Sequence, residues 1–303
     1  MVIGSPPLRS ASPLFGSIRS LCVVVGFVAV TGHDVRMLSS LAPARRRVVM
    51  AVLLLVLVAL ATAGGLLVTR DTPAAPVAQD VPGPVLLVPG YGGSTAALEV
   101  LAATLQDRGR DATVVALAGD GTGDLREQAG VLETAAEAAL RRTGAASVDV
   151  VGYSAGGVVA RLWVREHGGD SLARRVVTLG SPHHGTSVAA LAVQITPQSC
   201  PEGCRQLAPD SALLAALNAG DETPSGPRFV SIWSSADQVV TPPESAQLAG
   251  AVDVRVQSVC PRSVVEHGEL PTDPQVQAIV LSELGTEEPS VPDTCERVRP
   301  ARS

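Results

Sequence analysis

The sequence predicts an α/β fold in which a mostly parallel sheet of about six strands carries helices on both faces. Two observations lead to this prediction. From residue 85 onward, short apolar runs bounded by Gly or Pro alternate with helical stretches rich in Ala and Leu. Hydrophobic residues make up 46% of the 303-residue chain, but aromatic residues only 2%. A core of Val, Leu and Ala suits buried parallel strands covered by Ala-rich helices.

The expected elements follow one another along the chain. Strands are predicted at residues 85–88, 112–117, 147–152, 175–179, 229–233 and 253–259. Helices are predicted at residues 95–108, 125–142, 155–166, 243–249 and 273–283. A long irregular region, about 181–227, interrupts the alternation and is expected to form a small cap. Right-handed crossovers bring the carboxyl ends of parallel strands to one edge of the sheet, so ligands are expected there.

The segment before the strands has the composition of an export signal. Arg45, Arg46 and Arg47 lead directly into an apolar run, residues 48–68, which contains no charge. Ala61-Thr62-Ala63 fits the small-residue pattern of a cleavage site, which predicts secretion. The same run is long enough to remain uncleaved as a membrane anchor. Both possibilities place the protein outside the cell, either secreted or held at the outer face of the membrane.

These features divide the chain into four regions. Met37 stands eight residues before the arginines, so residues 1–36 are interpreted as a mis-annotated upstream extension. Residues 37–70 form the signal peptide or N-terminal membrane anchor. Residues 71–84 read as a Pro- and Ala-rich linker. Residues 85–303 are expected to form the catalytic domain, which includes the cap.

Charge and cysteine usage narrow the choice of partners. Residues 64–303 hold 17 of the 23 basic residues and 28 of the 29 acidic ones, a net charge of about −11, which disfavours nucleic-acid binding. Four cysteines remain when Cys22 is set aside, an even number that indicates two disulfides in an exported chain. Three pairings are possible, and we prefer one close and one distant pair: Cys200 with Cys204, and Cys260 with Cys295. No second Cys or His pair with the spacing of metal ligands accompanies the close pair, so no metal is expected.

The most informative motif is Gly152-Tyr153-Ser154-Ala155-Gly156, a G-x-S-x-G sequence between a predicted strand and a predicted helix. The pentapeptide alone is a weak signal, and an ordinary Gly-rich turn is the alternative. A strand that turns this tightly into a helix forces the serine into a strained conformation, and glycine on both sides removes Cβ clashes. The serine hydroxyl would then project at the ligand edge, near a helix N-terminus that favours negative charge. Ser154 is therefore the candidate nucleophile.

A serine nucleophile needs a base and an acid that orients it. His267 lies in the loop after the last strand, and among the five histidines only this one leaves room for an acid between nucleophile and base. His183 and His184 follow a strand and are the alternatives. Asp237 is the candidate acid because it follows the strand at 229–233, although a turn-forming role is the alternative.

An oxyanion hole needs two backbone N–H groups. One is expected from Ala155, directly after the nucleophile. The other is expected from Tyr91, because residues 88–93 form a Gly-rich loop after the first strand. The side chains of Tyr91 and Tyr153 either line an acyl entrance or simply pack.

Taken in order, LLVPGYGG, VVGYSAGG, VTLGSPHHGT, the Asp237 turn and VEHGELP resemble bacterial extracellular lipases and esterases of the α/β-hydrolase superfamily. The segment CPEGCRQLAPDSALLAALN resembles a stretch found in the same group. The resemblance covers about residues 85–285 and implies the α/β-hydrolase fold, carboxylic-ester hydrolysis with Ser154, Asp237 and His267 as triad, and oxyanion donors at Tyr91 and Ala155. Pro89 stands where many relatives carry His, and some lipases have Pro there.

The expected protein is a monomeric hydrolase of acyl esters or lipids that needs no cofactor. A cutinase-like hydrolase, a thioesterase or an acyltransferase would use the same triad. A non-catalytic binding protein of the same fold is less favoured, because such proteins lose triad members. In the cap, SVAALAVQI and SALLAAL either form an apolar acyl groove or simply cover the sheet. The groove would favour short to medium acyl chains with little activation at a lipid–water interface.

Overall fold

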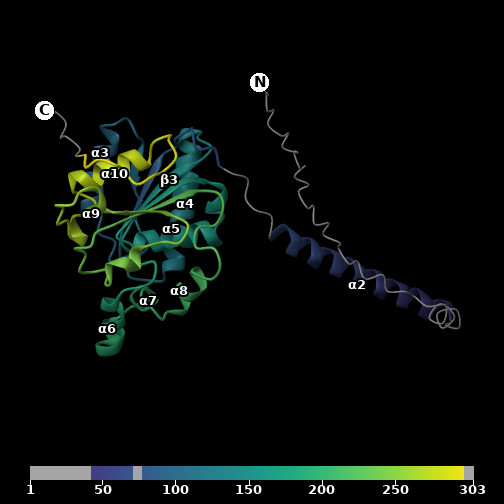
Figure 1. Cartoon of the computed structure of the whole chain (residues 1–303). Coiled ribbons are helices and arrows are strands. Elements are labelled where there is room, and N and C mark those ends of the chain that lie inside the picture. The colour runs from purple at the N-terminus through teal and green to yellow at the C-terminus, as the bar shows by residue number, and fades with distance from the viewer. Residues whose placement is uncertain (1–41, 71–76, 297–303) are drawn as a thin grey trace, which may run out of the picture. The chain divides into compact units, whose positions relative to one another are not determined.

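The computed structural model describes residues 42–70 and 77–296. The chain divides into two compact units, Met1–Thr72 and Pro73–Ser303 (Figure 1). The first unit contains helix α2 (Pro43–Arg70), whose apolar side chains between Val48 and Leu60 are exposed wherever they are described. None of the helices in the described residues is long and apolar enough to cross a membrane. The predicted upstream extension, residues 1–36, and residues 71–76 of the predicted linker lie outside the described residues.

The second unit is built on one six-stranded sheet with the order β2-β1-β3-β4-β5-β6, and every pair of neighbouring strands is parallel. The predicted α/β class is therefore correct, and so is the prediction of a parallel sheet. The strands are β1 (Val85–Val88), β2 (Ala112–Val114), β3 (Val148–Tyr153), β4 (Ala173–Leu179), β5 (Arg228–Trp233) and β6 (Val252–Arg255).

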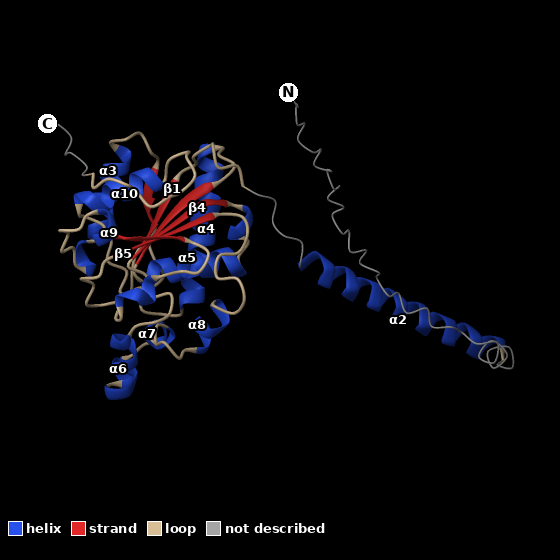
Figure 2. Ribbon diagram, in the orientation of Figure 1, coloured by secondary structure: helices blue, strands red, loops and turns tan. Residues whose placement is uncertain are grey.

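Helices cover both faces of this sheet (Figures 1 and 2). Helices α3 (Ala96–Gln106) and α10 (Pro274–Glu283) pack on one face, where their Leu, Val and Ile side chains join a core cluster with strand residues. Helices α4 (Leu125–Thr143) and α5 (Ala155–Glu166) pack on the other face in a second cluster. The central strands β1, β3 and β4 are buried along almost their whole length, which explains why they read as continuous apolar runs.

The cap region contains three short helices that sequence reasoning did not assign. These are α6 (Ser187–Ile195), α7 (Glu202–Gln206) and α8 (Ala212–Leu217). The two apolar stretches of the cap behave differently. Helix α8 buries its three leucines in the core, so it covers the domain, whereas helix α6 buries only Ala189.

The strand predicted at residues 253–259 is shorter than expected. Strand β6 ends at Arg255, and residues Val256–Val259 form one helical turn, α9. Val256 and Val259 are both buried and lie three positions apart, so a helical turn places both in the core, whereas a strand would point them to opposite faces. The helix predicted at residues 243–249 is a 3-10 turn, Pro243–Ala246.

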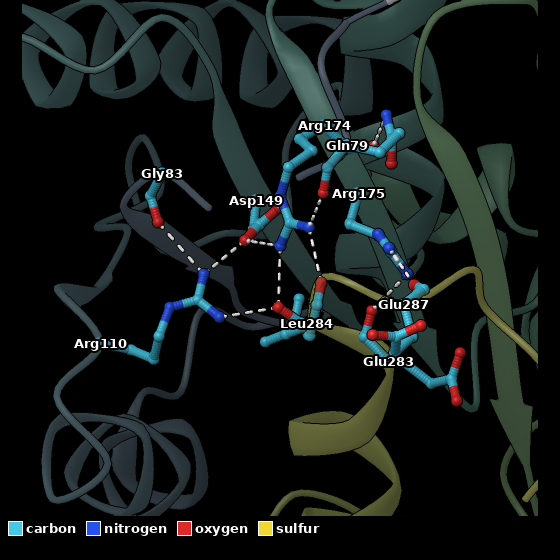
Figure 3. A network of polar contacts seen from close by, with 10 residues as sticks. Gln79, Gly83, Arg110, Asp149, Arg174, Arg175, Glu283, Leu284 and Glu287 are labelled. Atoms are coloured by element: carbon cyan, nitrogen blue, oxygen red, sulfur yellow. Dashed lines mark hydrogen bonds and ion pairs between the residues drawn. The ribbon is translucent and has the colours of Figure 1, made fainter. Parts of the chain in front are cut away.

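A buried network of charges occupies the amino ends of the central strands (Figure 3). Arg174 of β4 donates two hydrogen bonds to the carboxylate of Asp149 on β3, with N–O distances of 2.9 and 2.7 Å. It also donates to the backbone carbonyls of Gln79, Leu284 and Gly285, so all of its donors serve fixed acceptors. Arg110 forms a second ion pair with the Asp149 carboxylate. Through Arg174, the network ties the segment before β1 and the segment after α10 to the amino edge of the sheet, opposite the expected ligand edge.

Candidate active site

Ser154 lies at the turn between β3 and α5, as the G-x-S-x-G motif predicts. Its backbone has φ 55° and ψ −127°, and it is the only non-glycine residue with positive φ in the described part of the chain. Such a conformation costs on the order of 1–3 kcal/mol, which the surrounding structure must offset. The strain turns the side chain out of the strand–helix path, at the carboxyl edge of the sheet.

The flanking glycines are required by close packing at this turn. A Cβ on Gly152 would lie 2.5 Å from the Cα of Gly157, and a Cβ on Gly156 would lie 2.2 Å from the carbonyl oxygen of Val88. Both distances are too short for any side chain. The two glycines therefore allow α5 to pack directly against β1 and β3 and hold Ser154 in its strained position.

His267 and Asp237 meet Ser154 in one hydrogen-bonded chain. Nε2 of His267 lies 3.0 Å from Oγ of Ser154, and Nδ1 lies 2.6 Å from Oδ2 of Asp237. Asp237 is 4% exposed and His267 7% exposed. The second carboxylate oxygen of Asp237 accepts hydrogen bonds from the backbone N–H groups of Val239 and Val240 at 2.8 and 2.9 Å. These bonds hold the carboxylate so that Oδ2 faces the imidazole.

The Asp237 and His267 loops are joined by residues that sequence reasoning missed. Ser234 is fully buried and donates a hydrogen bond to the carbonyl of Val265, and its Oγ accepts one from Nε2 of Gln257 at 2.8 Å. Oε1 of Gln257 accepts from the backbone N–H of Ser235 at 3.0 Å. A buried Ser beside a Gln 23 positions away carries no local sequence signal, since only the fold brings them together.

Gly180 is a further residue that the sequence did not single out. It follows β4 with a φ of 54°, and a Cβ at this position would lie 3.1 Å from Oδ2 of Asp237 and 3.3 Å from Nδ1 of His267. Glycine therefore leaves room for the Asp237–His267 hydrogen bond. Its place directly after a strand that ends at the ligand edge is the only signal that points to it.

The loop after β1 approaches Ser154 closely. A Cβ on Gly90 would lie 2.9 Å from the Cβ of Ser154, so this loop passes directly over the serine. Within the described part of the chain, no hydrogen bond engages the backbone N–H of Tyr91 or of Ala155. Both groups therefore remain available as donors, as an oxyanion hole requires. The Tyr91 side chain is 40% exposed, and its partial burial, together with the nearby charge of Asp120, raises the pKa of its phenol.

Tyr153 is engaged with the base. Its hydroxyl donates to the backbone carbonyl of His267 at 3.2 Å, and its ring lies 5.2 Å from the imidazole, centroid to centroid. Burial, together with the charge of Asp237, raises the pKa of this phenol to about 12, so it stays protonated and able to donate. Tyr153 thus packs against the site.

The other described histidines are bound elsewhere. His183 is fully buried, and its Nε2 lies 3.1 Å from Oγ1 of Thr178. Burial holds the pKa of His183 well below its usual value. His184 pairs with Glu222 at 3.1 Å, and His167 pairs with Glu133 at 2.9 Å. None of the three contacts Ser154.

The structure contains two disulfides, Cys200–Cys204 and Cys260–Cys295, which is the pairing that we preferred. The first lies in the cap and joins Cys200, which precedes α7, to Cys204 within α7. The second joins the end of α9, just before the His267 loop, to the C-terminal tail. In the described residues, no group of three or more His, Cys, Asp or Glu side chains is arranged to hold a metal ion.

Comparisons with known proteins agree with this fold. Residues 130–268 match the family model of class 2 lipases, and no curated protein matches the chain significantly. The Bacillus licheniformis lipase BlEst2 in its propeptide form is 19% identical, with a TM-score of 0.58 over 75% of this chain and 55% of that one. Aspergillus fumigatus lipase B is 16% identical, with a TM-score of 0.56 over 70% of this chain and 55% of its own. The lin2722 gene product of Listeria innocua is 14% identical, with a TM-score of 0.51 over 70% and 97% of the two chains.

The chain thus spans about half the length of the first two of these structures. The structural similarities show an α/β-hydrolase fold, and residues 130–268 resemble class 2 lipases in sequence. The expected resemblance to lipases and esterases is confirmed.

Proposed function

From an α/β-hydrolase fold that resembles lipases, we propose that this chain is a serine carboxylic-ester hydrolase that works through an acyl-enzyme intermediate. One observation carries the proposal. Ser154 Oγ, the His267 imidazole and the Asp237 carboxylate form a continuous hydrogen-bonded chain of 3.0 and 2.6 Å. A nucleophile within reach of a base, which is itself oriented by a buried acid, is the arrangement that activates a serine hydroxyl.

In the first step, Ser154 Oγ attacks the ester carbonyl carbon while Nε2 of His267 takes the hydroxyl proton. The carbonyl electrons move to oxygen, and the backbone N–H groups of Ala155 and Tyr91 stabilise the resulting oxyanion. Asp237 keeps the Nδ1 proton of His267 directed toward itself, which leaves Nε2 free as the base and stabilises the imidazolium.

The tetrahedral intermediate then collapses and releases the alcohol, which takes the proton from His267. Water enters next, gives a proton to His267 and attacks the acyl-enzyme. A second collapse returns the proton to Ser154 Oγ and releases the carboxylic acid. Each step uses the same three side chains, so no cofactor is required.

The proposed substrates are acyl esters of short to medium chain length. The cap of residues 181–227 contains three short α-helices, and the Cys200–Cys204 disulfide lies within it. A cap this small offers limited apolar surface for a long acyl chain. We further propose that the chain is exported, because a basic triplet leads into the apolar run of residues 48–68. N-terminal sequencing of protein recovered from the medium or the membrane fraction tests both export and cleavage.

Labelling with a fluorophosphonate probe tests the nucleophile directly. The wild-type chain should be labelled covalently at Ser154, and the Ser154→Ala variant should not be labelled. Ser181, which is buried close to Gly157, provides a matched control. A Ser181→Ala variant should retain labelling. If the probe modified the Ser154→Ala chain equally well, the proposed mechanism would be wrong.

A further inference from the structure

Exposed apolar side chains gather at the edge of the sheet that carries the candidate active site. In the described part of the unit Pro73–Ser303, nine large apolar side chains are exposed. Three of them are set aside: Val81 precedes β1, Val100 lies on helix α3, and Val291 follows α10. The remaining six follow the carboxyl ends of β1, β4, β5 and β6, which in a parallel sheet lie at one edge. They are Tyr91, Val188, Leu191, Ile195, Val239 and Val264.

Helix α6 contributes half of this set. Val188, Leu191 and Ile195 are 49%, 55% and 69% exposed, and their spacing of three and four residues places them along one face of the helix. Only Ala189 on the opposite side is buried. The segment from Gly185 to Pro201 contains no charged residue. Helix α6 also extends from the body of the unit in Figures 1 and 2. A surface helix without charges, whose apolar face points outward, is unusual for a protein surrounded only by water.

Hydrogen bonds hold this helix beside the Asp237 turn. Thr186, the N-cap of α6, donates to the carbonyl of Val239 at 2.6 Å and accepts from the backbone N–H of Thr241 at 3.1 Å. The backbone N–H of Ser187 donates to the carbonyl of Thr241 at 2.8 Å. Val239 also donates to the Asp237 carboxylate. Val239 therefore links the two: its carbonyl binds the N-cap of α6, and its backbone N–H binds the candidate acid, Asp237.

We propose that the outward face of α6, made by Val188, Leu191 and Ile195 and continued by Val239, docks on the surface of a net-neutral lipid or ester layer. This inference rests on the proposed function and adds that the enzyme reaches its ester substrate in a layer and not only in solution. Docking by this face would bring the sheet edge with Ser154 toward the layer that contains the ester.

Charge favours a neutral layer over an anionic one. The α6 part of the docking face lies within residues 185–201, which contain no charged residue, whereas residues 64–303 have a net charge of about −11. An acidic body is repelled by anionic lipid headgroups, but an uncharged apolar helix inserts into the boundary between headgroups and acyl chains. A second copy of the chain would gain less, because two acidic bodies would have to approach each other.

A tryptophan placed on the docking face tests the proposal. In the full chain with Ser154→Ala, Leu191→Trp and, as matched control, Val100→Trp on α3 are mixed with phosphatidylcholine vesicles. The two native tryptophans, Trp163 and Trp233, are buried, so iodide quenching reports mainly on the introduced indole. In the Leu191→Trp variant, emission should shift to shorter wavelength and quenching should fall at least about threefold, whereas the Val100→Trp variant should show neither change. Both variants contain α2, so any lipid binding by that helix is common to them.

A second measurement connects docking with turnover. The double variant Leu191→Ser with Ile195→Ser should hydrolyse emulsified tributyrin about tenfold more slowly, because two apolar side chains no longer leave water on docking. The same double variant should hydrolyse dissolved p-nitrophenyl acetate within about twofold of the wild-type rate. The control variant Val100→Ser should hydrolyse both substrates within about twofold of the wild-type rate.

Several outcomes would contradict the docking proposal. If the indole of the Leu191→Trp variant stays open to iodide beside vesicles, while the wild-type chain hydrolyses dissolved p-nitrophenyl acetate normally, docking is wrong and the proposed function stands. A spectral shift that needs no vesicles and grows with protein concentration would assign the face to a second copy instead. A wild-type chain that hydrolyses no ester would contradict the proposed function, and the docking proposal would fall with it.

Discussion

The hydroxyl of Tyr153 donates a hydrogen bond of 3.2 Å to the backbone carbonyl of His267, and its ring packs beside the imidazole. Tyr153 comes directly before Ser154, so one residue of the motif links the nucleophile's strand to the loop of the base. The phenol thereby restricts where the imidazole lies relative to Oγ. We regard Tyr153 as a positioning residue.

Replacing Tyr153 by Phe keeps the ring and removes only this hydrogen bond. A net loss of about 0.5–1.5 kcal/mol corresponds to a decrease in kcat of about twofold to tenfold. KM should change little, because the hydroxyl is bonded to the protein's own backbone. Steady-state kinetics on p-nitrophenyl butyrate measures the split. A purely structural role would instead lower the melting temperature and leave kcat of the folded protein unchanged.

The second prediction concerns the base. Ser154→Ala and His267→Ala should each lower ester hydrolysis by several orders of magnitude, and the double variant should lose little more, because triad members act as a unit. His184→Ala is the matched control, since this side chain pairs with Glu222 and not with the serine. An inactive His184→Ala chain beside an active His267→Ala chain would show that the base is misassigned.

A third prediction follows from Glu283 at the end of α10, which is only 2% exposed and has a carboxylate oxygen without a partner. Burial raises the pKa of this carboxyl to about 7, although Arg175 and a backbone N–H oppose the rise. The folded protein therefore holds a proton that the unfolded chain releases at its ordinary pKa of 4.5. Folding stability from this group is complete below that value and is lost as the pH rises toward about 7.

The neutral isostere reveals this effect. Glu283→Gln should match the wild-type melting temperature at acidic pH and exceed it at pH values of about 8, where the wild-type carboxyl is charged. Glu287→Gln is the control, because that side chain is exposed and only its backbone carbonyl accepts from Arg175. Differential scanning calorimetry across the range measures both variants. Equal pH profiles for wild type and Glu283→Gln would contradict the prediction.

The two disulfides should differ in their contribution to stability. Cys260–Cys295 joins residues 35 positions apart, and Cys200–Cys204 joins residues 4 apart. In the chain-entropy model the longer loop contributes about 4 kcal/mol to the free energy of unfolding and the shorter about 2 kcal/mol. Paired Cys→Ala variants in guanidinium unfolding experiments measure each value. Peptide mapping without reduction checks the pairing itself.

The last prediction concerns acyl-chain length. Because hydrogen bonds hold α6 beside the Asp237 turn, hydrolysis of dissolved esters should need no lid movement. On p-nitrophenyl esters from acetate to palmitate, the rate should be highest for short to medium chains and substantial below the solubility limit. A preference for palmitate with a sharp rise above its solubility would mean that the cap opens as a lid.

Local sequence was sufficient for most of the framework. Strand runs of Val and Leu between Gly and Pro predicted the six strands, because a buried parallel strand is apolar on both faces. The same reasoning found Ser154, since a G-x-S-x-G turn between strand and helix has a distinctive local pattern. It extended the second strand to residue 117, whereas β2 ends at Val114. It also erred at residues 256–259, where the burial of Val256 and Val259 together favours a helical turn over continued strand.

The residues that support the site could be identified only from the tertiary structure, because they are far apart in the sequence. Ser234 and Gln257 are 23 residues apart, Gly180 precedes His267 by a much longer stretch, and Arg174 meets Asp149 across neighbouring strands. The sheet also decided which apolar stretch of the cap is core and which is exposed, a difference between α8 and α6 that their compositions do not reveal. Hydrophobic periodicity is a local property of the chain, whereas burial and polar partners depend on which segments the crossovers place side by side.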